Sequence, residues 1–247
     1  MVNDYSRKVT HHGYENLEKL KKYYHRLDKI ICVKKVDDTT SLFAYYFYDN
    51  NFVYYSTSGN ISPIICIVIF SWLSIGLFWI VDEVLTTVYL FIAVLSGLIT
   101  IFFAIYLFTK PKKERILNRR DGLVTMTGFF WQKNITMEFK KVEFSYSTGG
   151  EDGTGAFNLE CIRPNKWKTF DDFSSAGLNC YQGISFITWY MDKNRPLPPG
   201  PVFDEFRDKD FERRKAAGFP KPLSPSIIPT PEATPEQQAE RERIGGW

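Results

Sequence analysis

The sequence predicts a membrane α-helical hairpin joined to a cytosolic α+β domain, which is a small, mostly antiparallel β structure with a capping helix. Two observations carry this prediction: two adjacent apolar runs without a charged residue, and short strand-like segments separated by turn residues on both sides of them. The average composition hides this division, because 44% of the 247 residues are hydrophobic and 24% are charged, as is usual for soluble proteins.

The apolar runs cover residues 61–80 and 84–108, and each is long enough to cross a membrane as a helix. A hydrocarbon core of about 30 Å takes about 20 helical residues. Only Val81, Asp82 and Glu83 separate the runs, so the two helices should be antiparallel neighbours. Neither run holds Asp, Glu, Lys, Arg or His, the residue types that usually mark an ion or proton path through a membrane.

Basic residues directly after the second run indicate the orientation of the hairpin. The positive-inside rule places them in the cytoplasm, and an even number of crossings brings both chain termini to the same side. The acidic turn between the helices then lies on the opposite side. The predicted membrane-orienting residues are Lys110, Lys112, Lys113, Arg115, Arg119 and Arg120.

Small residues recur on the second helix at spacings that allow two helix backbones to approach closely. We expect them to pack against Ser71, Ser74 and Gly76 of the first helix, although such spacings also arise by chance and the two interpretations carry equal weight. The predicted helix-packing residues are Ala93, Ser96, Gly97, Thr100 and Ala104.

The cytosolic residues 1–60 should contribute a helix and a β-hairpin. The range 14–29 has apolar residues at spacings of three and four, which predicts an amphipathic helix. Packing on the protein is favoured over a position on the membrane surface, because its acids dilute the basic face expected of a lipid binder. The range 30–36 is strand-like, and 41–55 predicts a hairpin with a turn at Asp49–Asn51. These strands need a partner, which the region after the hairpin can supply.

Residues 109–195 predict the β-rich domain. Strand-like segments cover 122–130, 135–146, 157–163 and 169–173, and a helix follows over 181–193. The glycine-rich stretch 149–155 lacks the Lys-Ser/Thr ending of a phosphate-binding loop, so we interpret it as a connection between strands.

Residues 196–247 form a proline-rich tail, since ten of the 13 prolines lie there. A charged helix is predicted over 203–218, with Phe203, Phe206 and Phe211 as anchors, and Thr234 should cap a second helix. These apolar residues favour a tail that docks on the domain or on a partner over a disordered one.

Residue patterns for catalysis or metal binding are not evident. The four cysteines form no CxxC pair, the three histidines are His11, His12 and His25, and GxSxG and HExxH motifs are missing. We therefore predict no enzyme activity, no cofactor and no metal. The net charge of +3 is too small to indicate nucleic acid as a partner.

Two stretches of the chain resemble known families. Residues 118–125 (NRRDGLVT) and 129–142, directly after a two-helix hairpin, are similar to bacterial membrane-anchored pleckstrin-homology-like domains, over about residues 60–190. The layout together with residues 189–200 (WYMDKNRPLPPG) resembles an uncharacterised family of proteobacterial two-helix membrane proteins often found beside type VI secretion genes.

The second resemblance implies a multi-pass protein of the bacterial inner membrane, in contact with lipids, that acts as an immunity protein against a cognate type VI toxin. It offers no catalytic residue to transfer. The alternative is a structural or assembly component of a membrane protein complex, and a homo-oligomer is compatible with either. A membrane-active toxin is a third class, but soluble parts confined to one side of the membrane count against it.

Overall fold

A computed structural model of the protein describes residues 4–15, 25–33, 45–55, 61–79, 86–148, 157–166, 169–173 and 179–247. The described residues form two compact units. Unit 1 takes in the described parts of 1–56, 114–127 and 134–247, and unit 2 those of 57–113 and 128–133. The N-terminal segment, the β-rich region and the C-terminal tail, separate segments in the sequence, thus belong to one folded unit.

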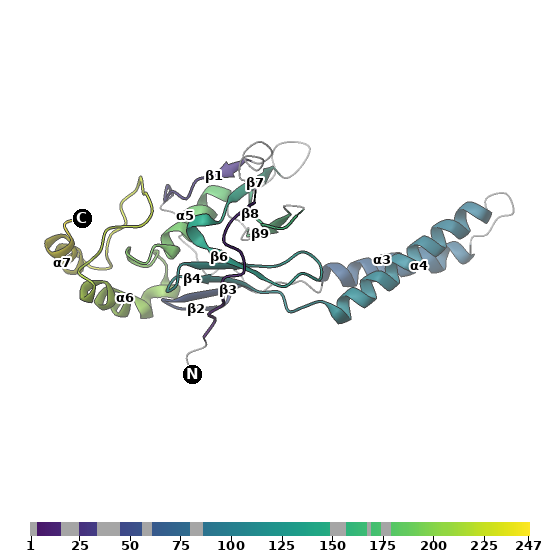
Figure 1. The fold of residues 1–247 in the computed structure, drawn as a ribbon, viewed down its shortest axis with the longest axis horizontal. Coiled ribbons are helices and arrows are strands. Elements are labelled where there is room, and N and C mark those ends of the chain that lie inside the picture. The colour runs from purple at the N-terminus through teal and green to yellow at the C-terminus, as the bar shows by residue number, and fades with distance from the viewer. Residues whose placement is uncertain are drawn as a thin grey trace. The chain divides into compact units, whose positions relative to one another are not determined.

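Unit 1 has an α+β fold, as predicted, with two antiparallel sheets (Figure 1). The five-stranded sheet has the order β2 (Tyr45–Tyr48), β3 (Phe52–Tyr55), β4 (Arg115–Asn118), β5 (Leu123–Met126) and β6 (Ile135–Glu138). The four-stranded sheet has the order β1 (Arg26–Leu27), β7 (Phe144–Thr148), β8 (Phe157–Ile162) and β9 (Phe170–Asp172). The glycine-rich stretch 149–155 lies outside the described residues.

The predicted hairpin turn at Asp49–Asn51 is confirmed between β2 and β3. The Asp49 carboxylate accepts hydrogen bonds from the backbone N–H groups of Asn51 and Phe52, both at 2.6 Å. Such a bond from an aspartate to the backbone two residues on is a common way to stabilise a turn. β3 then pairs with β4, from beyond the apolar helices in sequence, so a long insertion separates two neighbouring strands.

The prediction of a single strand segment over 135–146 is wrong. A 3-10 turn, η1 (Phe139–Lys141), divides it, so that β6 pairs with β5 while β7 pairs with β1 and β8 in the other sheet. The Phe139 N–H donates to the Gly122 carbonyl oxygen at 2.8 Å, which anchors the turn to the neighbouring connection. Buried apolar residues lie on both sides of the turn, and their pattern alone does not reveal a change of sheet.

Helix α5 (Cys180–Met191) packs on β8 and closes one core with both sheets (Figure 1). A capping box starts it: the Asn179 side chain accepts from the Gln182 N–H, and the Gln182 side chain accepts from the Asn179 N–H. A methyl group at Gly183 would lie 3.0 Å from the Leu159 side chain, so the glycine permits close contact of helix and sheet. The helix predicted over 181–193 is thereby confirmed.

The helix predicted over 14–29 is wrong at the ends that the structure describes. Residues 14–15 and 25 are not helical, and Arg26–Leu27 form β1, which pairs with β7. Residues 16–24 and 34–44 lie outside the described residues. The strand predicted over 30–36 is wrong where the structure describes it, because residues 30–33 form no strand. Ile31, from that range, forms a parallel bridge to Ser226 of the tail.

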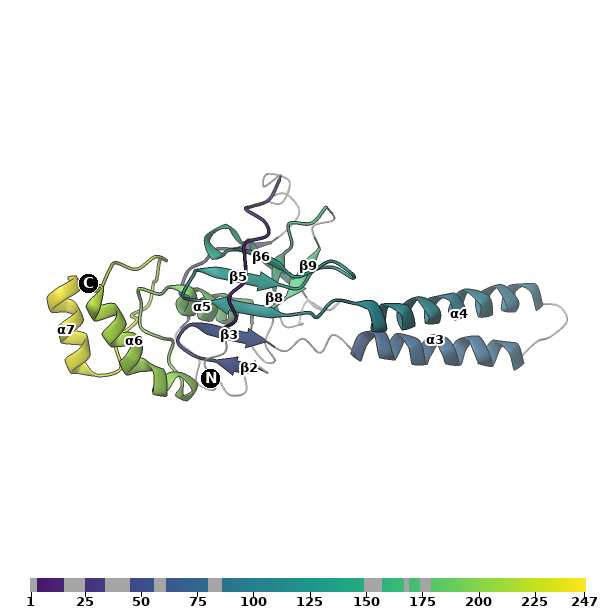
Figure 2. The same cartoon turned by 60° about the horizontal axis from the view of Figure 1, so that its bottom comes forward.

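The C-terminal tail packs on the rest of unit 1. It contains η2 (Pro201–Phe203), α6 (Asp204–Ala216) and α7 (Pro235–Gly245), and Figure 2 shows α6 and α7 side by side. The predicted anchors Phe203 and Phe211 are buried, as is Phe219, while Phe206 is partly buried against the core. The Thr234 hydroxyl caps α7 by accepting from the Gln237 N–H at 3.2 Å.

Unit 2 is a hairpin of two apolar helices, α3 (Ile61–Trp79) and α4 (Thr86–Thr109), with the predicted connection at 81–83 outside the described residues (Figure 1). Of the described helices, one contains a stretch long and apolar enough to cross a membrane, Thr87–Thr109 in α4, while the apolar stretch of α3, Ile61–Leu77, is shorter. Most of their large apolar side chains face outward.

Candidate functional site

A pocket of about 520 Å³ opens on unit 1 beside the docked tail, and we call it the tail groove. The turn after β6, the end of α5 and the tail loop at 223–225 form its walls. Concave sites of this size are the usual first candidates for binding in a protein. Its charged lining residues are Lys29, Arg119, Asp121, Glu138, Lys140 and Lys193, and its apolar ones include Phe139, Met191, Leu223 and Pro225.

The lining of the tail groove carries more positive than negative charge. Lys29 lies over the Phe139 ring at 5.2 Å and donates to the Lys140 carbonyl oxygen at 2.8 Å. Burial lowers the pKa of the Lys29 ammonium. The Lys140 ammonium pairs with Glu138 at 2.9 Å, and hydrogen bonds from Lys140 and Lys141 hold the pKa of Glu138 below its usual value. Lys193 is exposed at the end of α5. The lining of the groove therefore carries a small net positive charge.

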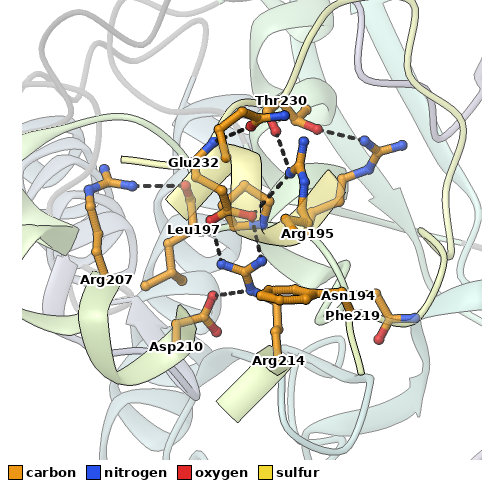
Figure 3. Close-up of polar contacts among 12 residues, drawn as sticks. Asn194, Arg195, Leu197, Arg207, Asp210, Arg214, Phe219, Thr230 and Glu232 are labelled. Atoms are coloured by element: carbon orange, nitrogen blue, oxygen red, sulfur yellow. Dashed lines mark hydrogen bonds and ion pairs between the residues drawn. The ribbon is translucent and has the colours of Figure 1, made fainter. Parts of the chain in front are cut away.

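The tail wall of the groove is held by polar side chains that follow α5. The Asp192 carboxylate accepts from the N–H groups of Leu223 and Ser224 at 2.9 and 3.0 Å. Arg195 donates to the Ser224 carbonyl oxygen at 2.8 Å and to the Thr230 hydroxyl at 2.7 Å (Figure 3). The Asn194 amide donates to the Lys221 carbonyl oxygen at 2.6 Å. The loop that lines the groove is therefore tied to the folded domain at several points.

Below the tail, Arg119 is fully buried although it was predicted to orient the hairpin. One guanidinium nitrogen donates to the Tyr190 carbonyl oxygen at 2.5 Å, at the end of α5. Another donates to the Arg195 carbonyl oxygen at 2.6 Å and pairs with Asp210 of α6 at 3.3 Å. Arg119 thus joins β4, α5 and the tail through a single side chain.

Asp210 and Glu232 continue this network within the tail, as Figure 3 shows around Arg214. The Arg214 guanidinium donates to Asp210 at 2.9 Å and makes two parallel bonds to the Glu232 carboxylate, both 2.7 Å. Arg241 of α7 also pairs with Glu232, at 3.1 Å. Bidentate pairs of this kind are among the stronger hydrogen bonds in proteins. They hold α6 and α7 to the loop between them.

Two charges in the network, Asp210 and Arg214, are kept ionised by their partners, whereas burial lowers the pKa of Arg119 even though Asp210 opposes the shift. Burial alone would raise the pKa of Asp210, but Arg119, Arg214 and Arg213 hold it below its usual value. Burial alone would lower the pKa of Arg214, but Glu232 and Asp210 raise it. Because both shifts favour the charged forms, the ion pairs contribute stability across neutral pH.

The end of the chain packs closely on the same tail. Trp247 donates through its indole N–H to the Phe219 carbonyl oxygen at 2.8 Å, and the Arg241 guanidinium lies 4.3 Å from the Trp247 ring centre. A methyl group at Gly245 would lie 2.7 Å from Phe219 Cβ, closer than real contacts allow. The last helix therefore depends on a residue without a side chain at this position.

The predicted membrane-orienting residues divide between the two units. Arg115 pairs with the buried Asp171 at 2.6 Å, and Arg120 lies 3.4 Å from Asp121, both within unit 1. Arg119 is the buried residue described above. The lysines of the predicted set, Lys110, Lys112 and Lys113, belong to unit 2. Nothing in these positions tests the orientation of the hairpin, which stays a prediction.

The predicted helix-packing residues lie on the face of α4 toward α3. Ala93 and Ser96 are buried, and Ser74 of α3 donates through its hydroxyl to the Ala93 carbonyl oxygen at 2.9 Å. A methyl group at Gly97 would lie 3.4 Å from the Ser74 hydroxyl oxygen. Thr100 and Ala104, further along α4, are half-buried. The small residues thus lie where the backbones approach.

Sequence reasoning missed the buried acids Asp192, Asp210 and Glu232. The spacing of Asp210 and Arg214 on one helix was a visible signal for a local pair, but it does not distinguish a buried pair from a solvated one. Glu232 lies 18 residues beyond Arg214, and only the fold brings them together. Among the described residues, no group of three or more His, Cys, Asp or Glu side chains is arranged to hold a metal ion.

Comparisons with protein-family models, curated proteins and solved structures gave no match for this chain. The two family resemblances therefore stay predictions.

We predict that Asp210→Ala destabilises unit 1, because it leaves Arg119 and Arg214 buried without their shared carboxylate. Breaking a buried ion pair in this way typically costs about 3–5 kcal/mol. Urea unfolding of the full chain in detergent, with trypsin sensitivity of the tail as a second readout, measures the change. Glu212→Ala on the exposed side of the same helix should stay within about 0.5 kcal/mol of the parent. Equal stability of both variants would contradict the role assigned to Asp210.

The same residue predicts how stability depends on pH. The pKa of Asp210 is lower in the folded protein than in the unfolded chain, so its contribution is complete above the unfolded pKa of about 4 and is lost as the pH falls through the folded pKa. We expect the free energy of unfolding to fall less for the Asp210→Asn variant than for the parent when the pH is lowered from about 4 to about 2. Urea unfolding of both proteins at several pH values measures this. An equal decrease in the free energy of unfolding for parent and variant would count against the prediction.

Proposed function

We propose that the protein is a non-enzymatic integral membrane binding protein, in which the α3–α4 hairpin holds unit 1 at the bacterial inner membrane and unit 1 binds a protein partner. The outward face of the hairpin carries this proposal. Trp72, Trp79, Phe91 and Phe108 are 81%, 86%, 68% and 86% exposed, within a long apolar surface on both helices. Soluble proteins rarely expose apolar surface on this scale, whereas lipid tails solvate it at no cost.

The dimensions of the helices support the same placement. The 24 residues of α4 extend about 36 Å at about 1.5 Å per residue, and the 19 of α3 about 28 Å, against a hydrocarbon core of about 30 Å. Lys110, Lys112 and Lys113 follow α4, which under the positive-inside rule puts that end and both chain termini in the cytoplasm.

Unit 1 is the part that recognises the partner, through the tail groove. Its rim includes Leu223, which is 63% exposed, and Ile227, 75% exposed, follows on the same loop. Exposed apolar patches rimmed by polar residues mark interaction sites on many proteins. The resemblance to proteins found beside type VI secretion genes supplies the specific partner, a cognate toxin that this protein neutralises. A subunit of a membrane protein complex is the alternative partner.

For the membrane placement, we predict that Leu98→Arg with Ile101→Arg abolishes stable insertion. Both side chains are more than half exposed on α4, and each arginine near a helix centre costs about 2.5–3.5 kcal/mol on insertion scales. Membranes washed with alkaline carbonate should retain the parent and the matched Leu98→Ala with Ile101→Ala variant but release the arginine variant. Complete release of the parent would overturn the proposal.

For the partner, we predict that Lys193→Glu weakens toxin binding by about tenfold through charge reversal at the groove. The exposed Lys209→Glu on α6 is the matched control and should bind as the parent does. Tagged protein is purified in detergent from its own host, and the products of neighbouring genes are quantified by mass spectrometry. Stoichiometric recovery of a toxin, with poisoning of cells that lack this gene, supports immunity. Recovery of membrane-complex subunits without poisoning would instead establish the alternative.

A further inference from the structure

The connection between β5 and β6, residues 128–133, folds as part of unit 2 and packs on the end of α4. Trp131 donates through its indole N–H to the Thr109 hydroxyl at 2.8 Å, and its ring meets those of Phe102 and Tyr106 edge-on, at 5.5 and 5.1 Å between ring centres. Phe130 packs on the same two rings, at 6.0 and 5.3 Å. We call residues 128–133 the aromatic turn.

The aromatic turn is a constrained structure. Lys113 donates through its ammonium to the carbonyl oxygens of Gly128 and Gln132, at 2.7 and 2.6 Å. A side chain at Gly128 would collide with the carbonyl oxygens of Gln132 and Lys133. Phe130 has a φ of 42°, which is unfavourable for a bulky residue and persists only where surrounding contacts enforce it. The turn therefore holds its three consecutive aromatic residues in fixed positions.

Two of these aromatic side chains remain open to the surroundings. Phe129 is 39% exposed and Trp131 is 42% exposed. Presenting large rings to water from a constrained turn is costly, so a covering surface is expected. Within unit 2, the exposed rings continue the apolar surface of the hairpin at the end of α4, where Phe108 is also exposed and the basic residues Lys110 and Lys112 follow.

We propose that the aromatic turn is a third membrane-binding element, whose Phe129 and Trp131 rings lie in the interfacial layer of a lipid bilayer. This inference rests on the proposed insertion of the hairpin. Tryptophan and other aromatic rings are favoured at the level of the lipid headgroups, between the hydrocarbon core and water. The neighbouring lysines carry the charge that complements lipid phosphates. A lipid surface matches this combination of rings and charge better than a protein groove does.

In the turn, the ring of Phe129 is the best reporter of the membrane because it is exposed and its replacement preserves the contacts of Trp131. We replace it with the photoreactive p-benzoylphenylalanine in the full chain, reconstituted into vesicles of phosphatidylethanolamine and phosphatidylglycerol. In a second variant, p-benzoylphenylalanine replaces Trp72 of α3, which is exposed on the hairpin, and reports on insertion of the hairpin. At Tyr181 of α5, which is 48% exposed in unit 1, it provides the matched control. After illumination, mass spectrometry quantifies lipid adducts at each position.

We expect lipid adducts at Phe129 to exceed those at Tyr181 by about fivefold or more, since an interfacial side chain is in continuous contact with lipid. If lipid adducts form at position 72 but those at position 129 are no more frequent than those at position 181, the inference is overturned and the proposed function is left intact. Loss of adducts at Trp72 as well would overturn both. Cross-linking of Phe129 to a second copy of the chain in place of lipid would show that protein covers the turn, and would also overturn the inference.

Discussion

The burial of Arg119 is the constraint on which unit 1 depends. A guanidinium placed away from water is tolerated only where acceptors surround it, and those acceptors come from the end of α5, from Arg195 and from Asp210. The chain beyond α5 therefore supplies a carbonyl acceptor and a carboxylate that replace water around this charge. Asp210 in turn is compensated by Arg214, and Arg214 by Glu232, so the ionic contacts pass from the sheet to the last helix of the chain.

The two units place their apolar side chains in opposite ways, inward in unit 1 and outward in unit 2. Unit 1 buries apolar side chains from both sheets and α5, and it buries paired charges both at the tail and around Asp171. In unit 2 the apolar side chains face outward, and the contact between helices uses small residues and the hydrogen bond from Ser74 to the Ala93 carbonyl oxygen. Close approach and dispersion can hold such helices together where no hydrophobic drive exists.

The elements predicted correctly from sequence are those set by local chemistry. The charge-free runs predicted helices α3 and α4. Asp49–Asn51 predicted the hairpin turn, and Thr234 predicted the start of α7. The failures concern long-range pairing. The change of sheet at Phe139 and the strand at Arg26–Leu27 depend on partners distant in the sequence. Likewise, nothing local distinguishes Arg119, which is buried, from Arg120, which is exposed.

The order of synthesis gives Arg119 two successive environments. Its partner Asp210 follows 91 residues later, which at about 5–20 residues per second takes about 5–20 s to make. Until then the guanidinium lacks the carboxylate with which it pairs in the folded chain. During the proposed insertion of the hairpin it therefore adds to the positive charge of Lys110, Lys112 and Lys113, and only the finished chain withdraws it into the interior. Under the proposed insertion, one arginine therefore contributes to the orientation of the hairpin early and to the fold of unit 1 late.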